Sequence, residues 1–157
     1  MEIKLIYIQS GKEEWAELAS QLYKKKINHY YKFTIDLIKT KSLPRSKKNE
    51  KIKLEKDLIF KKISNTDYLV IFDENGKKFE NSILFSKEIE SVFNLGKQKI
   101  IFLIGGSYGF SNEIKERADK KISLSSLTMN HHVAKIAAME QIYRSICIIK
   151  NIPYHNE

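Results

Sequence analysis

Short apolar runs, separated by segments whose apolar residues recur at helical spacing, constrain the fold of this chain more than any other feature. Four runs are typical of strands: "IKLIYI" (residues 3–8), "YKFTIDLI" (31–38), "YLVIF" (68–72) and "KIIFLI" (99–104). A fifth candidate strand is "ISLSS" (122–126). Strands that alternate with helices predict an α/β fold, in which a parallel sheet carries helices on both faces. We expect one domain over residues 1–157, since this length suits a single hydrophobic core.

The segments between the runs carry helix signals. In the first of them, Trp15, Leu18 and Leu22 recur at helical spacing and form one apolar stripe. Asn81 suits the N-cap of a helix over residues 81–95. Further helices are expected over residues 49–63, from Ser111 onward, and over residues 132–150.

The net charge of +9 favours a polyanionic partner such as RNA or DNA. Lysine greatly outnumbers arginine, however, and an AT-rich genome would give the same bias without any nucleic-acid role. The distribution of charge is more informative, because residues 41–62 contain nine basic and three acidic side chains. This segment is either a surface that contacts RNA or an ordinary solvated face.

Other features exclude several classes of protein. No apolar run approaches the roughly 20 residues that span a bilayer, and the first residues, which turn polar after Ile8, do not resemble a signal peptide. The single cysteine, Cys147, excludes an internal disulfide framework and a zinc site of several cysteines. We therefore expect a soluble, cytoplasmic protein with no membrane segment.

In parallel sheets, ligands bind beyond the carboxyl ends of the strands. Three segments follow the predicted strands at that edge: "DENGK", "GGSYG" and "SSLTMN". We expect the first of them to form a turn. The second places Gly105, Gly106 and Gly109 where a ligand could approach the backbone closely, but it matches neither the dinucleotide fingerprint nor the P-loop. The alternative is a tight turn between strand and helix.

The third segment offers many backbone donors and acceptors beside Leu127 and Met129. Such a surface suits an adenine or a small apolar group, although Ser and Thr here could instead cap the last helix. His131 and His132 follow directly. Because adjacent histidines are expected to point apart and no acidic residue lies nearby in the sequence, we expect no metal site.

The last helix and the tail concentrate further polar groups. Glu140 and Arg144 are four residues apart and can pair on one helix face. The pair is either a surface ion pair of small energetic value or an arginine held ready for an anionic ligand. The chain then ends in "NIPYHNE", and a proline, a phenol and an imidazole are unusual in a tail that nothing ties down.

Taken in order, "FDENGK", "FLIGGSYGFS" and "SLSSLTMNHHVAKIAAMEQIYRS" leading to "NIPYHNE" resemble the RlmH family, also called YbeA-like proteins. The length and the N-terminal "IKLIYIQSGKEEW" also fit, so the resemblance covers essentially the whole chain. Members of this family are small bacterial methyltransferases of the SPOUT class. The chain departs from the family pattern at Ser107, Tyr108, Asn130 and Asn156.

The resemblance implies that the C-terminal part of the sheet is threaded into a trefoil knot whose loops bind S-adenosyl-L-methionine as cofactor. It also implies a homodimer that requires no metal. Phe72 would flank the cofactor after the third strand, and Gly105 and Gly106 would allow close backbone approach. The loop around the adenine and methionine portions would comprise Leu124, Ser125, Ser126, Leu127, Thr128 and Met129.

The activity that the resemblance implies is methylation of N3 of a pseudouridine in a hairpin loop of 23S ribosomal RNA, within the assembled ribosome. His155 would help to remove the imide proton, and Tyr154 would stack on the target base or hydrogen-bond to its edge. Arg144 would offset developing charge or hold a phosphate. We then expect the tail to fold back over the cofactor, with a second subunit and the ribosome completing the substrate site. Alternatively, the tail residues only pin the tail to the fold.

Two rival functions stay open at this point. One is a non-catalytic RNA-binding or ribosome assembly factor that uses the same basic surface. The other is a SPOUT methyltransferase that acts on another RNA, such as transfer RNA. Cofactor binding separates the enzyme from the pure binder, and the identity of the methylated RNA separates the two enzymes.

Overall fold

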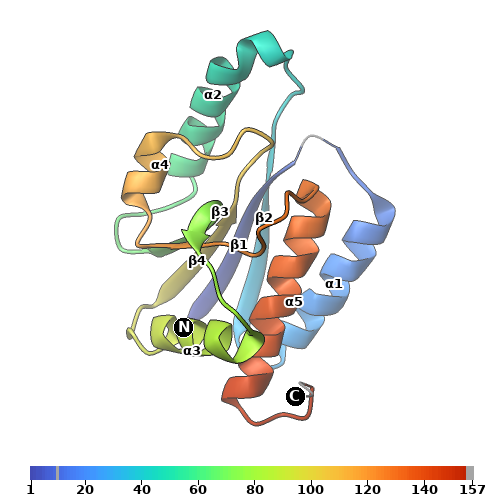
Figure 1. Cartoon of the computed structure of the whole chain (residues 1–157), viewed down its shortest axis with the longest axis vertical. Helices are drawn as coiled ribbons and strands as arrows, with labels where there is room; N and C mark the ends of the chain where they lie inside the picture. The colour runs from blue at the N-terminus through green and yellow to red at the C-terminus, as the bar shows by residue number, and fades with distance from the viewer. Residues whose placement is uncertain (10, 155–157) are drawn as a thin grey trace.

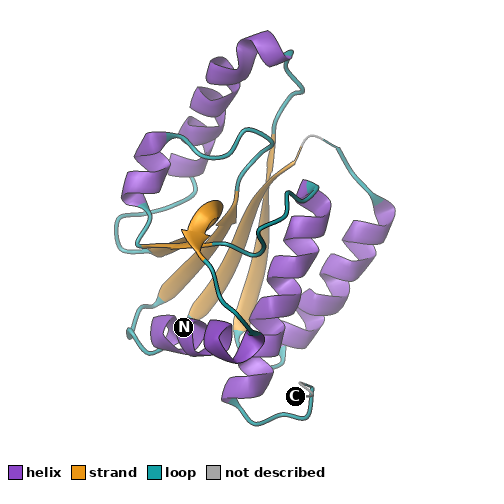
Figure 2. Cartoon of the chain, viewed as in Figure 1, coloured by secondary structure: helices purple, strands orange, loops and turns teal. Residues whose placement is uncertain are grey.

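A five-stranded sheet forms the centre of the molecule in the computed structural model, which describes residues 1–9 and 11–154 (Figures 1 and 2). Every strand pairing is parallel, and the strand order is β2-β1-β4-β3-β5. The strands are β1 Glu2–Gln9, β2 Lys32–Lys39, β3 Tyr68–Lys77, β4 Lys99–Ile104 and β5 Lys120–Ile122. The predicted parallel α/β sheet is confirmed, whereas the trefoil knot stays a prediction.

Helices cover both faces of this sheet. They are α1 Glu14–Asn28, α2 Lys48–Phe60, α3 Ser82–Phe93, α4 Asn112–Arg117 and α5 His131–Ile149, with a short 3-10 turn, Arg45–Lys47, before α2. α1, α3 and α5 pack on one face, and α2 and α4 pack on the other (Figure 1). In the part of the chain that the structure describes, no helix is long and apolar enough to cross a membrane.

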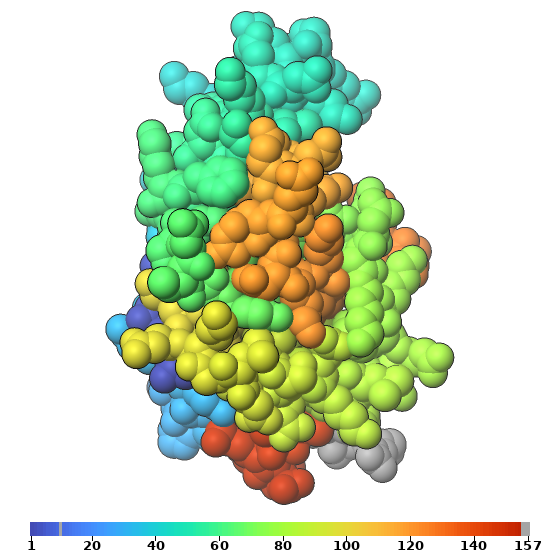
Figure 3. Space-filling view, turned by 90° about the vertical axis from the view of Figure 1, so that its left-hand side faces the viewer, coloured from blue at the N-terminus to red at the C-terminus, as the bar shows by residue number. Residues whose placement is uncertain are grey.

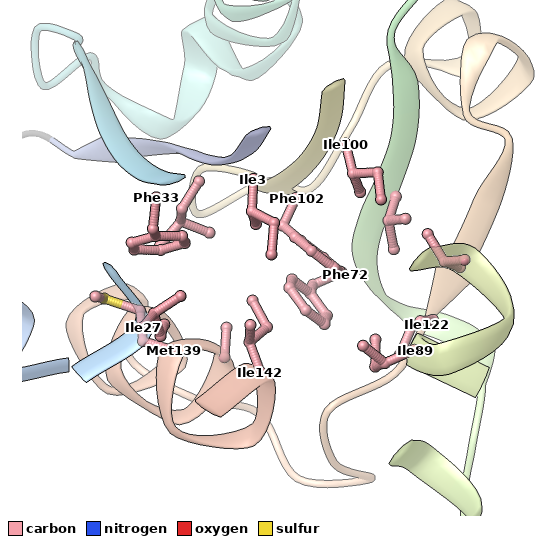
Figure 4. Close-up of a cluster of buried hydrophobic side chains, with 14 of the residues drawn as sticks. Ile3, Ile27, Phe33, Phe72, Ile89, Ile100, Phe102, Ile122, Met139 and Ile142 are labelled. Atoms are coloured by element: carbon pink, nitrogen blue, oxygen red, sulfur yellow. The ribbon is translucent and has the colours of Figure 1, made fainter. Parts of the chain in front are cut away.

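Alternation along β4 divides the core into two clusters, since successive side chains of a strand point to opposite faces. Phe102 joins the cluster beneath α1, α3 and α5, where its ring stacks on Phe72 at a centroid distance of 5.8 Å (Figure 4). Leu103 joins the smaller cluster with Ile59 of α2 and Ile114 of α4. Both faces of β4 are therefore buried, as its continuous apolar sequence predicts.

Two strand boundaries differ from those expected from the sequence. "DENGK" is not a turn, because β3 continues through it to Lys77. Gly76 permits this course, since a Cβ atom there would lie only 2.6 Å from the backbone of Ile122 in β5. β5 in turn ends at Ile122, and Ser123 leaves the sheet after donating its N–H to the carbonyl of Lys77 at 2.9 Å. In Figure 3 the orange α4 and β5 lie between α2 and the lime-green segment that follows β3.

Side-chain caps fix the starts of three helices. The Asn81 side chain accepts the N–H of Leu84 at 2.9 Å, and Ser111 accepts the N–H of Ile114 at 3.3 Å, as the sequence predicts for α3 and α4. Asn130 caps α5 by accepting the N–H of His132 at 2.8 Å. Asn130 replaces a residue common in the resembled family, and its capping bond gives the replacement a local role.

Candidate active site

A pocket of about 690 Å³ lies at the carboxyl ends of β3, β4 and β5. The three segments singled out from the sequence meet there, at one edge of the parallel sheet. The pocket walls include Phe72, Asp73 and Glu74 within β3, Gly105, Gly106, Ser107, Tyr108, Gly109 and Phe110 after β4, and Leu124, Ser125, Leu127, Thr128, Met129 and Asn130 before α5. The size is within the range of small-molecule sites, roughly 300–1,000 Å³.

The glycines of the second loop are required by their surroundings. A Cβ atom on Gly105 would lie 2.9 Å from the ring of Phe110, and one on Gly106 would lie 2.6 Å from both carboxylate oxygens of Glu55. Gly109 has φ +73° and donates its N–H to the carbonyl of Gly106 at 3.1 Å, which closes a tight turn. The loop therefore combines a tight turn with a pocket wall of bare backbone, so both sequence alternatives describe it.

A buried carboxylate lies behind that wall. Glu55 of α2 is only 2% exposed, and neither of its carboxylate oxygens has a hydrogen-bond partner among the described residues. The ammonium of Lys51 lies 3.9 Å away, beyond hydrogen-bond distance. Burial raises the pKa of the Glu55 carboxyl, and the charge of Lys51 opposes that rise.

The loop before α5 is held by its own hydroxyls. Ser123 donates to the carbonyl of Ser125 at 2.9 Å, and Ser125 accepts the N–H of Leu127 at 3.0 Å. Leu127 is 78% exposed, so this apolar side chain is available to a ligand in the pocket. All the residues predicted to contact the cofactor line the pocket except Ser126.

The two histidines after this loop do not point apart, contrary to the expectation from the sequence. The ring centroids of His131 and His132 are 4.2 Å apart, because both side chains turn inward at the first turn of α5. Burial is the main cause of the lowered pKa of His131, and the nearby positive charges of His132 and Lys51 add to it. Within residues 1–9 and 11–154, no three His, Cys, Asp or Glu side chains form a group suited to a metal.

The opposite end of α5 carries the predicted catalytic side chains that the structure describes. Arg144 donates to Glu140 from Nε at 2.9 Å and from Nη2 at 2.5 Å, and the Tyr154 hydroxyl donates to the same carboxylate oxygen at 3.2 Å. The guanidinium carbon of Arg144 also lies 4.9 Å from the centroid of the Tyr154 ring. Burial raises the pKa of the Tyr154 hydroxyl, with Tyr23 and Glu140 adding to it, so this group remains protonated at neutral pH. His155 lies outside the described residues.

Within one chain, these side chains do not meet the pocket. Ala134 of α5 lines the pocket, and Arg144 lies ten residues further along the helix, a separation of about 15 Å at the helical rise. Within its own chain, the tail as far as Tyr154 returns to α5 at Glu140, which agrees with the alternative that these residues pin the tail to the fold. That the tail folds over a bound cofactor stays a prediction. Figure 1 shows the described end of the tail at the foot of α5, away from the pocket loops.

Ion pairs reduce the effective charge of the basic segment over residues 41–62. The lysines that pair there are Lys47 with Glu50, Lys51 with Glu55, Lys56 with Asp57 and Glu113, and Lys62 with Asp36. The structure shows no such pair, among the residues it describes, for Lys41, Arg45, Lys48, Lys53 and Lys61. Of these, Lys48 lines the pocket and lies 5.8 Å from the centroid of the Tyr108 ring.

No sequence pattern distinguishes Glu55 and Lys51 from other charged residues. They lie four residues apart on α2, and that spacing is common on exposed helix faces. Their importance depends on the contact between α2 and Gly106, which only the tertiary structure brings about. Lys26 and Tyr23 were missed for the same reason, since their partners on α5 and in the tail are more than a hundred residues away.

The parallel sheet and the pocket at its edge agree with the SPOUT class of methyltransferases that the sequence resembles. Comparison with known proteins supports the same class. A solved structure of a probable methylase family protein from Haemophilus influenzae Rd KW20 has a TM-score of 0.56 and 14% identity, over 99% of this chain and 70% of that one. This similarity concerns the fold alone. The family model described as "Predicted SPOUT methyltransferase" matches residues 1–155.

The chain belongs to this SPOUT methyltransferase family. A protein from Bdellovibrio bacteriovorus named "Ribosomal RNA large subunit methyltransferase H" is 44% identical over 156 residues, covering 99% of each chain. One of the same name from Christiangramia forsetii is 41% identical over 160 residues, also covering 99% of each. The family resemblance that the sequence motifs indicate is thereby confirmed.

Proposed function

We propose that this protein transfers a methyl group from S-adenosyl-L-methionine to ribosomal RNA of the large subunit, and that the acceptor is N3 of a pseudouridine in the assembled ribosome. The observation that carries the proposal is the pocket, whose walls are formed by part of β3 and by the loops after β4 and β5. Family membership and full-length relatives named for ribosomal RNA methylation support it. The ribosomal substrate would place the protein in the cytoplasm.

The pocket residues fit a cofactor with an adenine, a sulfonium and an amino-acid end. Bare backbone at Gly105 and Gly106 allows a flat ring to lie close, and Leu127 and Met129 offer apolar cover. Asp73 and Glu74 line the same pocket together with Lys48 and Lys115, and Lys115 pairs with Asp73 at 3.2 Å. The lining therefore offers both signs of charge to a ligand that carries a sulfonium, an ammonium and a carboxylate. S-adenosyl-L-methionine supplies an electrophilic methyl group, and the loops would orient that group toward the acceptor nitrogen.

A second copy of the chain would bring the tail to the pocket. Trp15, Leu18 and Leu22 of α1 are 49%, 67% and 53% exposed and form an apolar stripe beside α5, where Val133 is also exposed. Burial of such a stripe favours association with a second copy. In a two-fold dimer whose α5 helices run antiparallel, the C-terminal end of one helix lies beside the N-terminal end of the other. Arg144 and Tyr154 of one copy would then face the pocket of its partner.

In such a composite site the side chains would divide the work. Tyr154 would stack on the base or hydrogen-bond to its edge, and burial, which raises the pKa of its hydroxyl, favours the neutral form of the side chain. Arg144, fixed by Glu140, would stabilise negative charge on the imide. His155 would accept the imide proton. Lys48, which lines the pocket and for which the described chain shows no ion pair, would contact a phosphate.

The test is methyl transfer with purified protein, labelled cofactor and three acceptors: whole ribosomes, deproteinised ribosomal RNA and bulk transfer RNA. The proposal predicts label in the large-subunit RNA of whole ribosomes, at a pseudouridine identified by mass spectrometry. Cofactor binding with label only in transfer RNA would favour a different RNA substrate. Ribosome binding without cofactor binding would favour a non-catalytic assembly factor, the alternative that the basic segment over residues 41–62 supports.

A further inference from the structure

Three tyrosine rings surround a lysine ammonium at the tail end of α5. The ammonium of Lys26, in the last turn of α1, lies 5.7 Å from the centroid of the Tyr23 ring, 5.1 Å from that of Tyr143 and 5.4 Å from that of Tyr154. These distances are within the range of a cation–π interaction, about 6 Å. One cation therefore joins three segments of the chain: α1, α5 and the tail.

The rings also contact one another. Tyr143 packs edge-on against Tyr154 with centroids 4.8 Å apart, and its centroid lies 6.3 Å from that of Tyr23. Burial raises the pKa of Tyr143 to about 12, so its ring carries no negative charge near neutral pH. The cluster is thus a neutral aromatic cage around a positive charge, a geometry that attracts the cation through the ring faces.

Tyr154 is held from several directions at once. Lys26 and Arg144 each lie near its ring, at 5.4 and 4.9 Å from the centroid. Its hydroxyl donates to Glu140, and its N–H donates to the carbonyl of Ile152 at 2.8 Å. Lys26 connects the tail to α1, as does a hydrogen bond between the side chains of Tyr23 and Tyr154, whereas the contacts with Arg144 and Glu140 come from α5 itself.

We propose that Lys26 is a positioning residue for the methyl transfer. Its ammonium, held among the three rings, fixes the orientation of the Tyr154 ring, and the Tyr154 ring in turn fixes the guanidinium plane of Arg144. Both groups are then oriented before the substrate base binds. This inference rests on the proposed function. Lys26 itself lies among its own chain's rings and needs no contact with substrate or cofactor. Removing it would loosen the tail from α1 and leave the distant pocket intact, because none of the pocket walls belongs to α1.

Three variants test this role. Lys26→Met keeps the length and apolar stem and removes the charge, and Lys26→Arg keeps the charge. Lys25→Met is the matched control, because Lys25 is an exposed neighbour for which the described part of the chain shows no ion pair or ring contact. Each is assayed for cofactor affinity by calorimetry, for kcat and KM on whole ribosomes, and for hydrogen exchange of the backbone N–H groups over residues 150–154.

The proposal predicts that Lys26→Met lowers kcat by about tenfold, a value between those of exposed and desolvated cation–π contacts, because Lys26 is partly buried. Cofactor affinity should stay unchanged, and hydrogen exchange in the tail should become faster. Lys26→Arg should recover most of the turnover, and Lys25→Met should match the unmodified protein in every assay.

Other outcomes would overturn the proposal. An increased KM with unchanged kcat and altered salt dependence would make Lys26 a phosphate contact. Equal defects in the Met and Arg variants would make it a packing residue only. If the unmodified protein binds no cofactor, the proposed function fails. Hydrogen exchange of the tail then still decides whether Lys26 holds Tyr154 in place, because that measurement does not depend on catalysis.

Discussion

At its N-terminal end, α5 borders a pocket that includes a glycine-containing loop, whereas at its C-terminal end it carries side chains that partner one another closely. The pocket end holds polar atoms without hydrogen-bond partners in the described chain, among them both oxygens of Glu55 and Nε2 of His131. The tail end, by contrast, ties Arg144, Tyr154 and Lys26 to a carboxylate and to aromatic rings.

This difference suits two separate tasks, the binding of a ligand at one end and the orientation of side chains at the other. Buried polar atoms without partners are costly, so they persist where a ligand or a loop movement provides the missing contact. Close pairing fixes side-chain orientation before a substrate arrives, which is what a transition-state contact needs. We infer that the pocket end of α5 binds the cofactor and that the tail end orients side chains toward the substrate base. Neither end is then sufficient alone for methyl transfer.

Lys135 lies on α5 between the pocket end and the tail end. Of the changes proposed here, its removal should have the largest effect, which is on the stability of the fold. Its ammonium is 1% exposed, pairs with Glu17 at 3.0 Å and lies 4.4 Å from the centroid of the Tyr7 ring. Lys135→Ala should lower the free energy of unfolding by about 3 kcal/mol, the low end for a broken buried pair, because Glu17 is partly exposed. Urea unfolding measures it, with Lys25→Ala as the control. A change below about 1 kcal/mol would contradict the structural role of Lys135.

Gly106 tests the pocket end alone. In Gly106→Ala the new Cβ must displace the buried carboxylate of Glu55, and we expect cofactor affinity to fall by about 100-fold from this overpacking. Gly11→Ala is the matched control, because a Cβ there meets nothing within 4 Å. Calorimetric titration with S-adenosyl-L-methionine makes the measurement. Equal affinities of the two variants would show that the glycine loop does not form the binding wall.

Arg144 tests the tail end alone. Arg144→Ala should lower kcat by roughly 30-fold, the value of a lost hydrogen bond to a charged group, and leave cofactor affinity unchanged. Lys25→Ala serves as the control, because Lys25 is exposed and the described chain shows no ion pair or ring contact for it. The kinetics are measured on whole ribosomes alongside calorimetry. Loss of cofactor binding in Arg144→Ala would mean that the two ends are not separate in function.

Glu55 should give the smallest effect, as a dependence of stability on pH. Because burial raises the pKa of its carboxyl in the folded protein, the ionised form favours the unfolded chain. Its stabilising contribution is therefore complete below the unfolded pKa of 4.5 and is lost as pH rises through the folded value. The melting temperature of the unmodified protein should then fall relative to that of Glu55→Gln as pH rises from 4.5 toward neutrality. Parallel curves for the two proteins would contradict a raised pKa.

The pocket end and the tail end depend on different kinds of sequence signal. The pocket follows from a rule of topology: loops after parallel strands meet at one edge, so the sequence alone is enough to group Gly106, Leu127 and their neighbours. The tail end depends on where α1 and α5 cross, and no local pattern encodes the meeting of Lys26 with Tyr154.

The strand errors have a similar cause. Gly and Asn in "DENGK" favour a turn locally, yet Gly76 is needed because β3 passes close to the backbone of β5. A glycine that serves close approach and a glycine that serves a turn look alike in one sequence. Within one chain Tyr154 hydrogen-bonds to Glu140 of its own α5, and the folding of the tail over a cofactor stays a prediction.

Mixing two inactive variants tests most directly whether binding and orientation come from opposite ends of α5 in two copies. Gly106→Ala keeps an intact tail end, and Arg144→Ala keeps an intact pocket. After joint refolding or co-expression, a composite site predicts recovery of about a quarter of the unmodified methyl-transfer activity, because half the dimers are mixed and each has one complete site of two. Activity no higher than the average of the separate variants would contradict the composite site and return the tail to the pocket of its own chain.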